Sequence, residues 1–174
     1  ENLYWRFYDI INSESRDFYQ FVEDYWQIYQ EAKSLVPQQK VRLIERIQFL
    51  DIELEELPAQ QKLTFDTYKK DKFQRRNIER WLENIANATI DIAKIILASE
   101  KKQMPKSYKE ALFDFAFLFG LKEQEARKFS EVAELRNILA HEYLDILYER
   151  IKDFLVNISP FYKKLLDFLE RYLK

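Results

Sequence analysis

The chain has 174 residues, with 28 basic and 30 acidic side chains and a formal net charge of −2. Its length and its 47% hydrophobic content allow one well-buried domain, and the near-neutral charge gives no general case for nucleic-acid binding. No cysteine and a single histidine exclude disulfides, cysteine nucleophiles and histidine-rich metal sites.

One glycine and four prolines argue against a sheet-rich fold, because hairpins and tight turns draw on these residues. We therefore predict an all-α protein. No run reaches the roughly 18 apolar residues of a membrane span, and no secretory signal opens the chain. We expect a cytoplasmic protein without membrane association, and, since the sequence starts without Met, one that begins inside a longer or processed polypeptide.

Residues 1–36 differ from the rest in composition, with three basic and seven acidic side chains. An aromatic-rich piece comes first, and Asn12 or Ser13 is the expected N-cap of a helix that runs up to Pro37. We interpret 1–36 as an extension with an additional N-terminal helix, and 37–174 as the main helical domain.

Apolar side chains at three- and four-residue spacing predict five helices in the main domain, joined by short connections that favour an antiparallel bundle. Pro58 is expected to close the first helix, Asp66 or Thr67 to cap the second, and Gly120 to end the third. Pro160 should kink the last one. In chain order the predicted helices cover 38–57, 67–99, 107–119, 122–143 and 144–173.

The chemistry concentrates in the segment Arg136-Asn137-Ile138-Leu139-Ala140-His141-Glu142-Tyr143. Five helical residues turn through about 500°, so Arg136 and His141 would lie roughly 140° apart and flank a groove. Asn137 precedes His141 by four positions, which lets its amide hold one tautomer of the imidazole. A permanent cation, a group that titrates near neutrality, an amide and a phenol thus share about two turns.

These residue types suit cleavage of RNA without a metal, since His141 would take the 2′-hydroxyl proton and Arg136 would stabilise the phosphorane. A glycine-rich phosphate loop and a serine nucleophile elbow are excluded, and the carboxylates nearby lack the repeated Glu-x-x-His pattern of di-iron bundles. We expect no metal and no other cofactor. From the residues alone, a polar pair at a helix end or interface remains the simpler interpretation.

The densest basic cluster lies near the start of the second helix of the main domain. It is a candidate contact for RNA or for an acidic partner. A solvated helix face is the alternative. The cluster comprises Lys69, Lys70, Lys72, Arg75 and Arg76.

The segment from Arg136 to Tyr143 resembles the R-x4-H-x-Y signature of HEPN-domain proteins, specifically the HepT toxins of HepT–MntA (type VII) toxin–antitoxin pairs. The similarity covers about Gln38 to the C-terminus. It includes the segments 78–81, 90–94 and 107–111 and the apolar helix that ends at Gly120.

The resemblance implies a HEPN-like antiparallel bundle and a homodimer whose Arg136 and His141 line a shared cleft. It implies metal-independent ribonuclease action on cellular RNA, tRNA included, with Arg136 binding phosphate, His141 as acid/base and Asn137 as a supporting polar residue. It also implies a partner, an MntA-type nucleotidyltransferase antitoxin that transfers AMP from ATP to Tyr143 and so neutralises the toxin. For Tyr143 the alternative is a packing role at the helix end.

Two other hypotheses stay open on this evidence. The chain could be a non-catalytic HEPN module that docks a nucleotidyltransferase as its acceptor or substrate-binding subunit, or its motif could be a polar dimer seam. Residues 1–36 depart from the family pattern and faintly resemble the tail of MntA-type nucleotidyltransferases, but a plain additional helix is the preferred interpretation.

Overall fold

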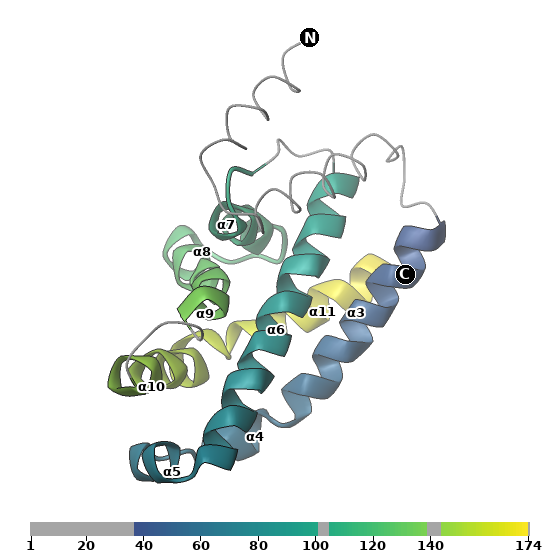
Figure 1. Cartoon of the computed structure of the whole chain (residues 1–174). Coiled ribbons are helices and arrows are strands. Elements are labelled where there is room, and N and C mark those ends of the chain that lie inside the picture. Colours follow the sequence, from purple (N-terminus) through teal and green to yellow (C-terminus); the bar gives the residue numbers. More distant parts are fainter. Residues whose placement is uncertain (1–36, 101–104, 139–143, 174) are drawn as a thin grey trace, which may run out of the picture.

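The computed structural model describes residues 37–100, 105–138 and 144–173. Every regular element within these ranges is helical (Figure 1), so the all-α prediction is confirmed. The predicted N-terminal helix falls in residues 1–36 and lies outside the described residues.

The helices range from a single turn to the 28 residues of α6. In chain order they are α3 (Pro37–Glu55), α4 (Leu57–Gln60), α5 (Phe65–Lys70), α6 (Lys72–Ser99), α7 (Tyr108–Leu118), α8 (Glu123–Ser130), α9 (Val132–Ile138), α10 (Leu144–Asp153), the π-helical turn η1 (Phe154–Ile158) and α11 (Phe161–Leu173).

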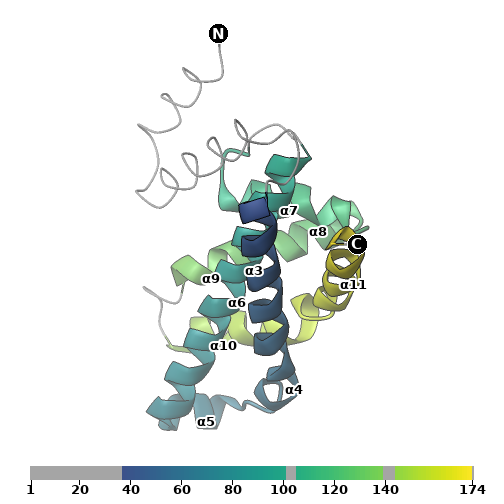
Figure 2. The same cartoon turned by 90° about the vertical axis from the view of Figure 1, so that its right-hand side faces the viewer.

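The long helix α6 runs through the middle of the bundle (Figures 1 and 2). It packs against α3, α5, α7 and α9. In both views α4 and α5 lie together at one end of the molecule, and α7 and α8 lie toward the other. The predicted helical bundle is therefore organised around one buried helix, as its apolar sequence requires.

The first two predicted helices begin and end differently from the prediction. Pro58 does not close a helix but stands in the first turn of α4, where a proline removes only an N–H that has no partner within the helix. The second helix divides at Asp71, whose backbone is extended. The expected caps Asp66 and Thr67 are wrong, because Thr64 caps α5 and Asp71 caps α6.

The side chains explain the division at Asp71. Its carboxylate accepts hydrogen bonds from the amides of Phe73 (2.9 Å) and Gln74 (3.1 Å), and Thr64 Oγ1 accepts one from the Thr67 amide (3.2 Å). Each cap satisfies amides that have no partner in the first turn of a helix, so a new helix start costs little here.

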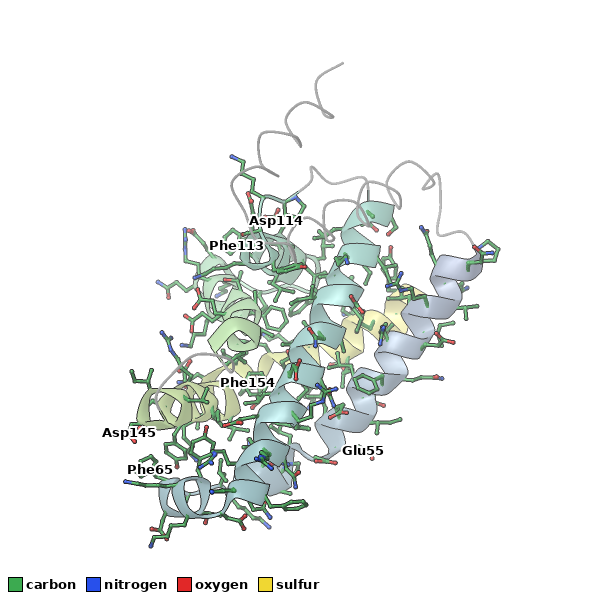
Figure 3. The ribbon with its side chains drawn as sticks, viewed as in Figure 1. Glu55, Phe65, Phe113, Asp114, Asp145 and Phe154 are labelled. Carbon is green, nitrogen blue, oxygen red and sulfur yellow. The ribbon has the colours of Figure 1, made fainter. Side chains whose placement is uncertain are left out.

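The core is rich in aromatic rings. Phe154, labelled in Figure 3, packs edge-on against Trp81 and Tyr162, with ring centroids 6.0 and 5.9 Å apart. Phe129 packs against Phe119 at 5.2 Å and Tyr162 at 5.6 Å. Such pairs add to the free energy that burial of the rings already contributes.

The three- and four-residue spacing places Val41, Leu50 and Phe73 on the core faces of their helices. Leu50 is fully buried as expected, but Val41 of α3 is 56% exposed and Phe73 of α6 is 71% exposed. Leu43, which this spacing leaves out, is fully buried on the core side of α3. Spacing alone does not say which apolar positions meet a neighbouring helix, and here the contact with α6 decides.

The last two predicted helices are also divided. The predicted helix 122–143 is interrupted at Glu131, between α8 and α9. The kink expected at Pro160 is confirmed, since α11 starts after it and η1 ends before it. Ser159 bridges the break, because its amide donates to the Phe154 carbonyl at 2.8 Å and its hydroxyl donates to the Leu155 carbonyl at 2.7 Å.

Gly120 ends α7 as predicted, with a positive φ of 84°. Its amide donates to the Phe117 carbonyl (3.1 Å), and the Leu121 amide donates to the Ala116 carbonyl (3.1 Å), which forms a Schellman motif.

We expect Gly120→Ala to lower the free energy of unfolding by about 1–2 kcal/mol, the cost of left-handed backbone for an L-residue. An added Cβ meets nothing within 4 Å, so backbone strain is the sole cost. Urea denaturation measures the change, with exposed Gln124→Ala as a control that should stay within about 0.5 kcal/mol of the parent. A Gly120→Ala protein as stable as the parent would contradict the argument.

Candidate active site

The motif from Arg136 to Tyr143 covers the end of α9 and all of residues 139–143, which separate it from α10. The backbone of Arg136 and Asn137 is helical, in the last turn of α9. His141 and Tyr143 lie outside the described residues, and so does the expected groove between Arg136 and His141. Their roles stay predictions.

The core holds α9 in place just before the motif. Val132, Ala133 and Leu135 are at most 5% exposed, as predicted, and α9 packs on α6 and α7. On the preceding helix, Ala126 and Phe129 are fully buried. The short helix that carries Arg136 is therefore anchored through the apolar residues that precede Arg136.

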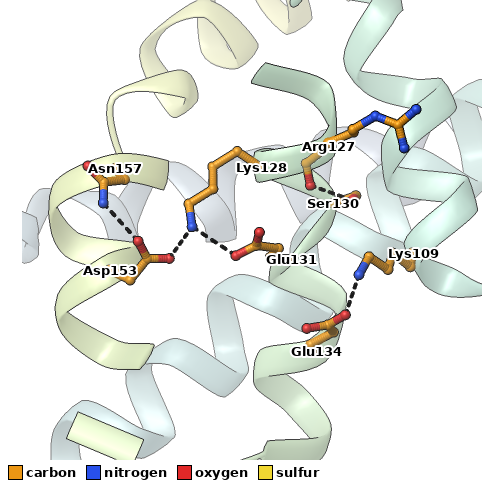
Figure 4. Close-up of polar contacts among 8 residues, drawn as sticks. All are labelled: Lys109, Arg127, Lys128, Ser130, Glu131, Glu134, Asp153 and Asn157. Atoms are coloured by element: carbon orange, nitrogen blue, oxygen red, sulfur yellow. Dashed lines mark hydrogen bonds and ion pairs between the residues drawn. The ribbon is translucent and has the colours of Figure 1, made fainter. Parts of the chain in front are cut away.

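A polar cluster around Lys128 joins the helices on either side of the motif (Figure 4). Lys128 Nζ lies 2.6 Å from a carboxylate oxygen of Asp153, at the end of α10, and 3.0 Å from one of Glu131. Asn157 Nδ2 donates to the other Asp153 oxygen at 2.8 Å. We call these four residues the Lys128 clamp, which links the junction of α8 and α9 to the end of α10.

A second ion pair braces α9 from the other side. Lys109 of α7 binds Glu134, two residues before Arg136 (Figure 4). Glu134 was among the carboxylates near the motif, and this contact gives it a bracing role. Neither the Lys109 pair nor the Asp153 contact was predicted, because their partners stand 25 residues apart and no sequence pattern connects them.

The clamp raises the pKa of Lys128 and lowers the pKa of Asp153, so it favours the charged form of each side chain. Burial lowers the pKa of Lys128, but its hydrogen bonds with Asp153 and Glu131 outweigh burial and leave the pKa above 10.5. Burial raises the pKa of Asp153, but its hydrogen bonds with Lys128 and Asn157 leave it below 3.8. The ion pair is thus intact across the neutral range.

We expect Lys128→Met to lower the free energy of unfolding at pH 7 by about 1–2 kcal/mol, between the values for exposed and buried ion pairs. A carboxylate with a depressed pKa stabilises the fold above its unfolded-state pKa and loses this contribution as pH falls through the folded-state value. The difference from the parent should therefore shrink toward pH 3. Urea denaturation at pH 7 and pH 3 measures it, with exposed Lys163→Met as control, and an equal difference at both pH values would contradict this role.

The predicted basic cluster lies where α5 meets α6. Lys70 pairs with Asp66 at 2.6 Å, Lys69 Nζ lies 5.7 Å from the centre of the Phe65 ring, and an Arg75 guanidinium nitrogen donates to the Lys69 carbonyl at 3.4 Å. The remaining two residues of the cluster, Lys72 and Arg76, are exposed.

No three His, Asp or Glu side chains among the described residues converge as a metal site requires. No described helix is both long and apolar enough to cross a membrane. Metal independence of the proposed chemistry stays a prediction.

An all-α bundle with an R-x4-H-x-Y segment between two of its helices defines a HEPN-type domain. A family model described as "HepT-like: Ribonuclease HepT-like" matches residues 38–171. The chain belongs to this HepT-like ribonuclease family, which confirms the resemblance and supports a ribonuclease activity. A comparison with curated proteins gave no match.

Proposed function

We propose that this protein is the toxin of a HepT–MntA-type pair and cleaves cellular RNA in the cytoplasm as a metal-independent endoribonuclease. The observation that carries the proposal is the HepT-like ribonuclease match over residues 38–171, combined with Arg136 and His141 at the spacing of the R-x4-H-x-Y signature. The burial of α9 residues just before Arg136 supports it, because a catalytic arginine needs a fixed backbone.

In the proposed reaction, His141 removes the proton of a ribose 2′-hydroxyl, and the 2′-oxygen attacks the adjacent phosphorus. Arg136 stabilises the added negative charge on the phosphorane. The bond to the 5′-oxygen then breaks and that oxygen takes up a proton, which leaves a 2′,3′-cyclic phosphate and a 5′-hydroxyl. An unperturbed histidine pKa of about 6.5 suits both proton transfers near neutral pH.

A homodimer fits this chemistry. Cleavage needs both a base for the 2′-hydroxyl and an acid for the leaving 5′-oxygen, and each chain holds a single histidine. Two copies related by a two-fold axis would bring two histidines and two Arg136 side chains into one cleft. Asn137 would hold the imidazole in the tautomer that the reaction requires.

The proposed switch is AMP transfer to Tyr143 by an MntA-type nucleotidyltransferase. The Tyr143 phenolic oxygen would attack the α-phosphorus of ATP, pyrophosphate would leave, and the phenolic proton would pass to a base of the partner. The AMP group adds bulk and negative charge two residues after His141, where both oppose the entry of RNA.

The experiment uses purified full-length protein and labelled RNA in EDTA. Cleavage with 2′,3′-cyclic phosphate ends is expected, and prior incubation with the nucleotidyltransferase, Mg²⁺ and ATP should abolish it while adding the mass of AMP. Tyr143→Phe should still cut RNA but gain no AMP. Transfer of AMP to a protein that never cuts RNA would overturn the ribonuclease proposal in favour of the non-catalytic module.

A further inference from the structure

The corner where α5 meets α6 carries cations and aromatic rings that the cleavage reaction does not use. Lys72, Phe73 and Arg76 fall within about 100° of arc on α6, and all three are exposed. On α5, Phe65 is 37% exposed and Lys69 lies over its ring. We call these five residues the corner surface.

The cations of this surface are available to a ligand. Of the nearby carboxylates, Asp66 pairs with Lys70, while Asp71 accepts the amides of Phe73 and Gln74 and keeps its charge. Within the described part of the chain, no ion pair involves Lys72 or Arg76. The cations of the cluster outnumber these carboxylates, so a polyanion would meet a net positive field here.

A solvated helix face would explain the exposed cations of this surface, but it does not explain the exposed ring of Phe73. It is 71% exposed, the highest fraction among the large apolar side chains of the described residues. Lys72 and Arg76 lie on the same side of it, at about 100° and 60° around the helix. An exposed ring beside cations is the arrangement with which proteins hold single-stranded nucleic acid, since the ring stacks on a base and the cations contact phosphates. The Phe65 and Lys69 pair repeats this combination on α5.

The corner surface also adjoins the helix that follows the motif. The ring of Phe65 lies 5.1 Å from the ring of Tyr148 on α10. Tyr148 follows Leu144 by four positions, about 6 Å along the helix axis. Figure 3 shows Phe65, at the start of α5, near Asp145, at the start of α10. RNA bound at the corner surface can therefore extend along α10 toward the residues that precede it.

We propose that the corner surface binds the substrate as single-stranded RNA, with Phe73 and Phe65 stacking on bases and Lys69, Lys72 and Arg76 contacting phosphates. This inference rests on the RNA-cleaving function proposed above and names the form of RNA that the enzyme takes. Flat rings beside cations suit a base and its phosphate, because every base has a face that can stack on a ring.

The test measures binding apart from cleavage, in the full-length His141→Ala protein, by fluorescence anisotropy of a labelled, unstructured RNA of about 12 nucleotides. Phe73→Ala should weaken binding about 5- to 100-fold, because stacking on that ring is lost. Lys72→Ala/Arg76→Ala should lower the slope of log Kd against log salt by about 1.4, or 0.7 for each phosphate contact. Circular dichroism checks that each variant is folded.

Matched controls come from α3, where Ile52 is 64% exposed and Lys40 and Arg42 are exposed. Ile52→Ala and Lys40→Ala/Arg42→Ala should bind RNA as the parent does. Corner variants that keep the parent affinity and salt slope would overturn the inference even if the wild-type protein cuts RNA. Unchanged RNA binding together with a lost complex with the nucleotidyltransferase would also overturn it and assign the surface to that protein.

Discussion

His141→Ala is expected to reduce RNA cleavage by about 10²- to 10⁴-fold, the usual contribution of one general acid or base. The loss should be large because the chain has no second histidine to replace it. The measurement is kcat/KM on a labelled RNA in EDTA, with the fold checked by circular dichroism. Glu142→Ala is the matched control, since Glu142 is the next residue and has no part in the proposed reaction.

The pH profile makes this prediction specific to an imidazole. In the wild-type protein kcat/KM should bend near the histidine pKa of about 6.5, and the residual activity of His141→Ala should not. Added imidazole should restore part of the activity by entering the space of the lost ring. A variant that cleaves RNA at the wild-type rate would remove His141 from the mechanism.

Phe129→Ala is expected to lower the free energy of unfolding by about 3–5 kcal/mol, as for other large rings removed from a core. The side chain is fully buried and lies against Phe119 and Tyr162. Because a domain has roughly 5–15 kcal/mol of stability in all, this one change would remove much of it. It would also loosen α8, which leads directly into the helix that carries Arg136.

Urea denaturation followed by circular dichroism measures the effect. Phe73→Ala is the matched control, because it removes the same ring from a position that is 71% exposed and should change stability by only about 0.5 kcal/mol. Equal losses of unfolding free energy in Phe129→Ala and Phe73→Ala would mean that burial of the ring does not determine how much its removal destabilises the fold. The same pair separates the two roles of phenylalanine in this chain, since Phe73→Ala should instead impair RNA binding.

Local patterns predicted correctly those features that depend on a few neighbouring residues. The helix expected from Ser107 is present, with its hydroxyl accepting the Glu110 amide, and Gly120 supplies the left-handed residue that ends it. Local patterns predicted helix caps less well, because several neighbouring residues can cap the same helix. Thr64 and Asp71 act as caps in place of Asp66 and Thr67, because all four side chains can accept an amide hydrogen bond and packing selects among them.

For the candidate site, the sequence predicts the chemistry but not the contacts that hold the neighbouring helices in place. Arg136 and His141 were predicted from residue type and spacing and Tyr143 from the family resemblance, and the roles of all three stay predictions. The Lys128 clamp was not anticipated. Its partners are ordinary charged residues until α8 and α10 are packed together.

The sequence by itself determined that this protein is an all-α HepT-like ribonuclease family member, because helical periodicity, scarce glycine and a spaced motif are all properties of short stretches. Only the tertiary structure decided where the long helical patterns divide, that Val41 and Phe73 face outward, and that Lys109 and Lys128 make ion pairs around the start of α9. The physical reason is that burial and ion pairing depend on residues far apart in the chain, which periodicity does not record.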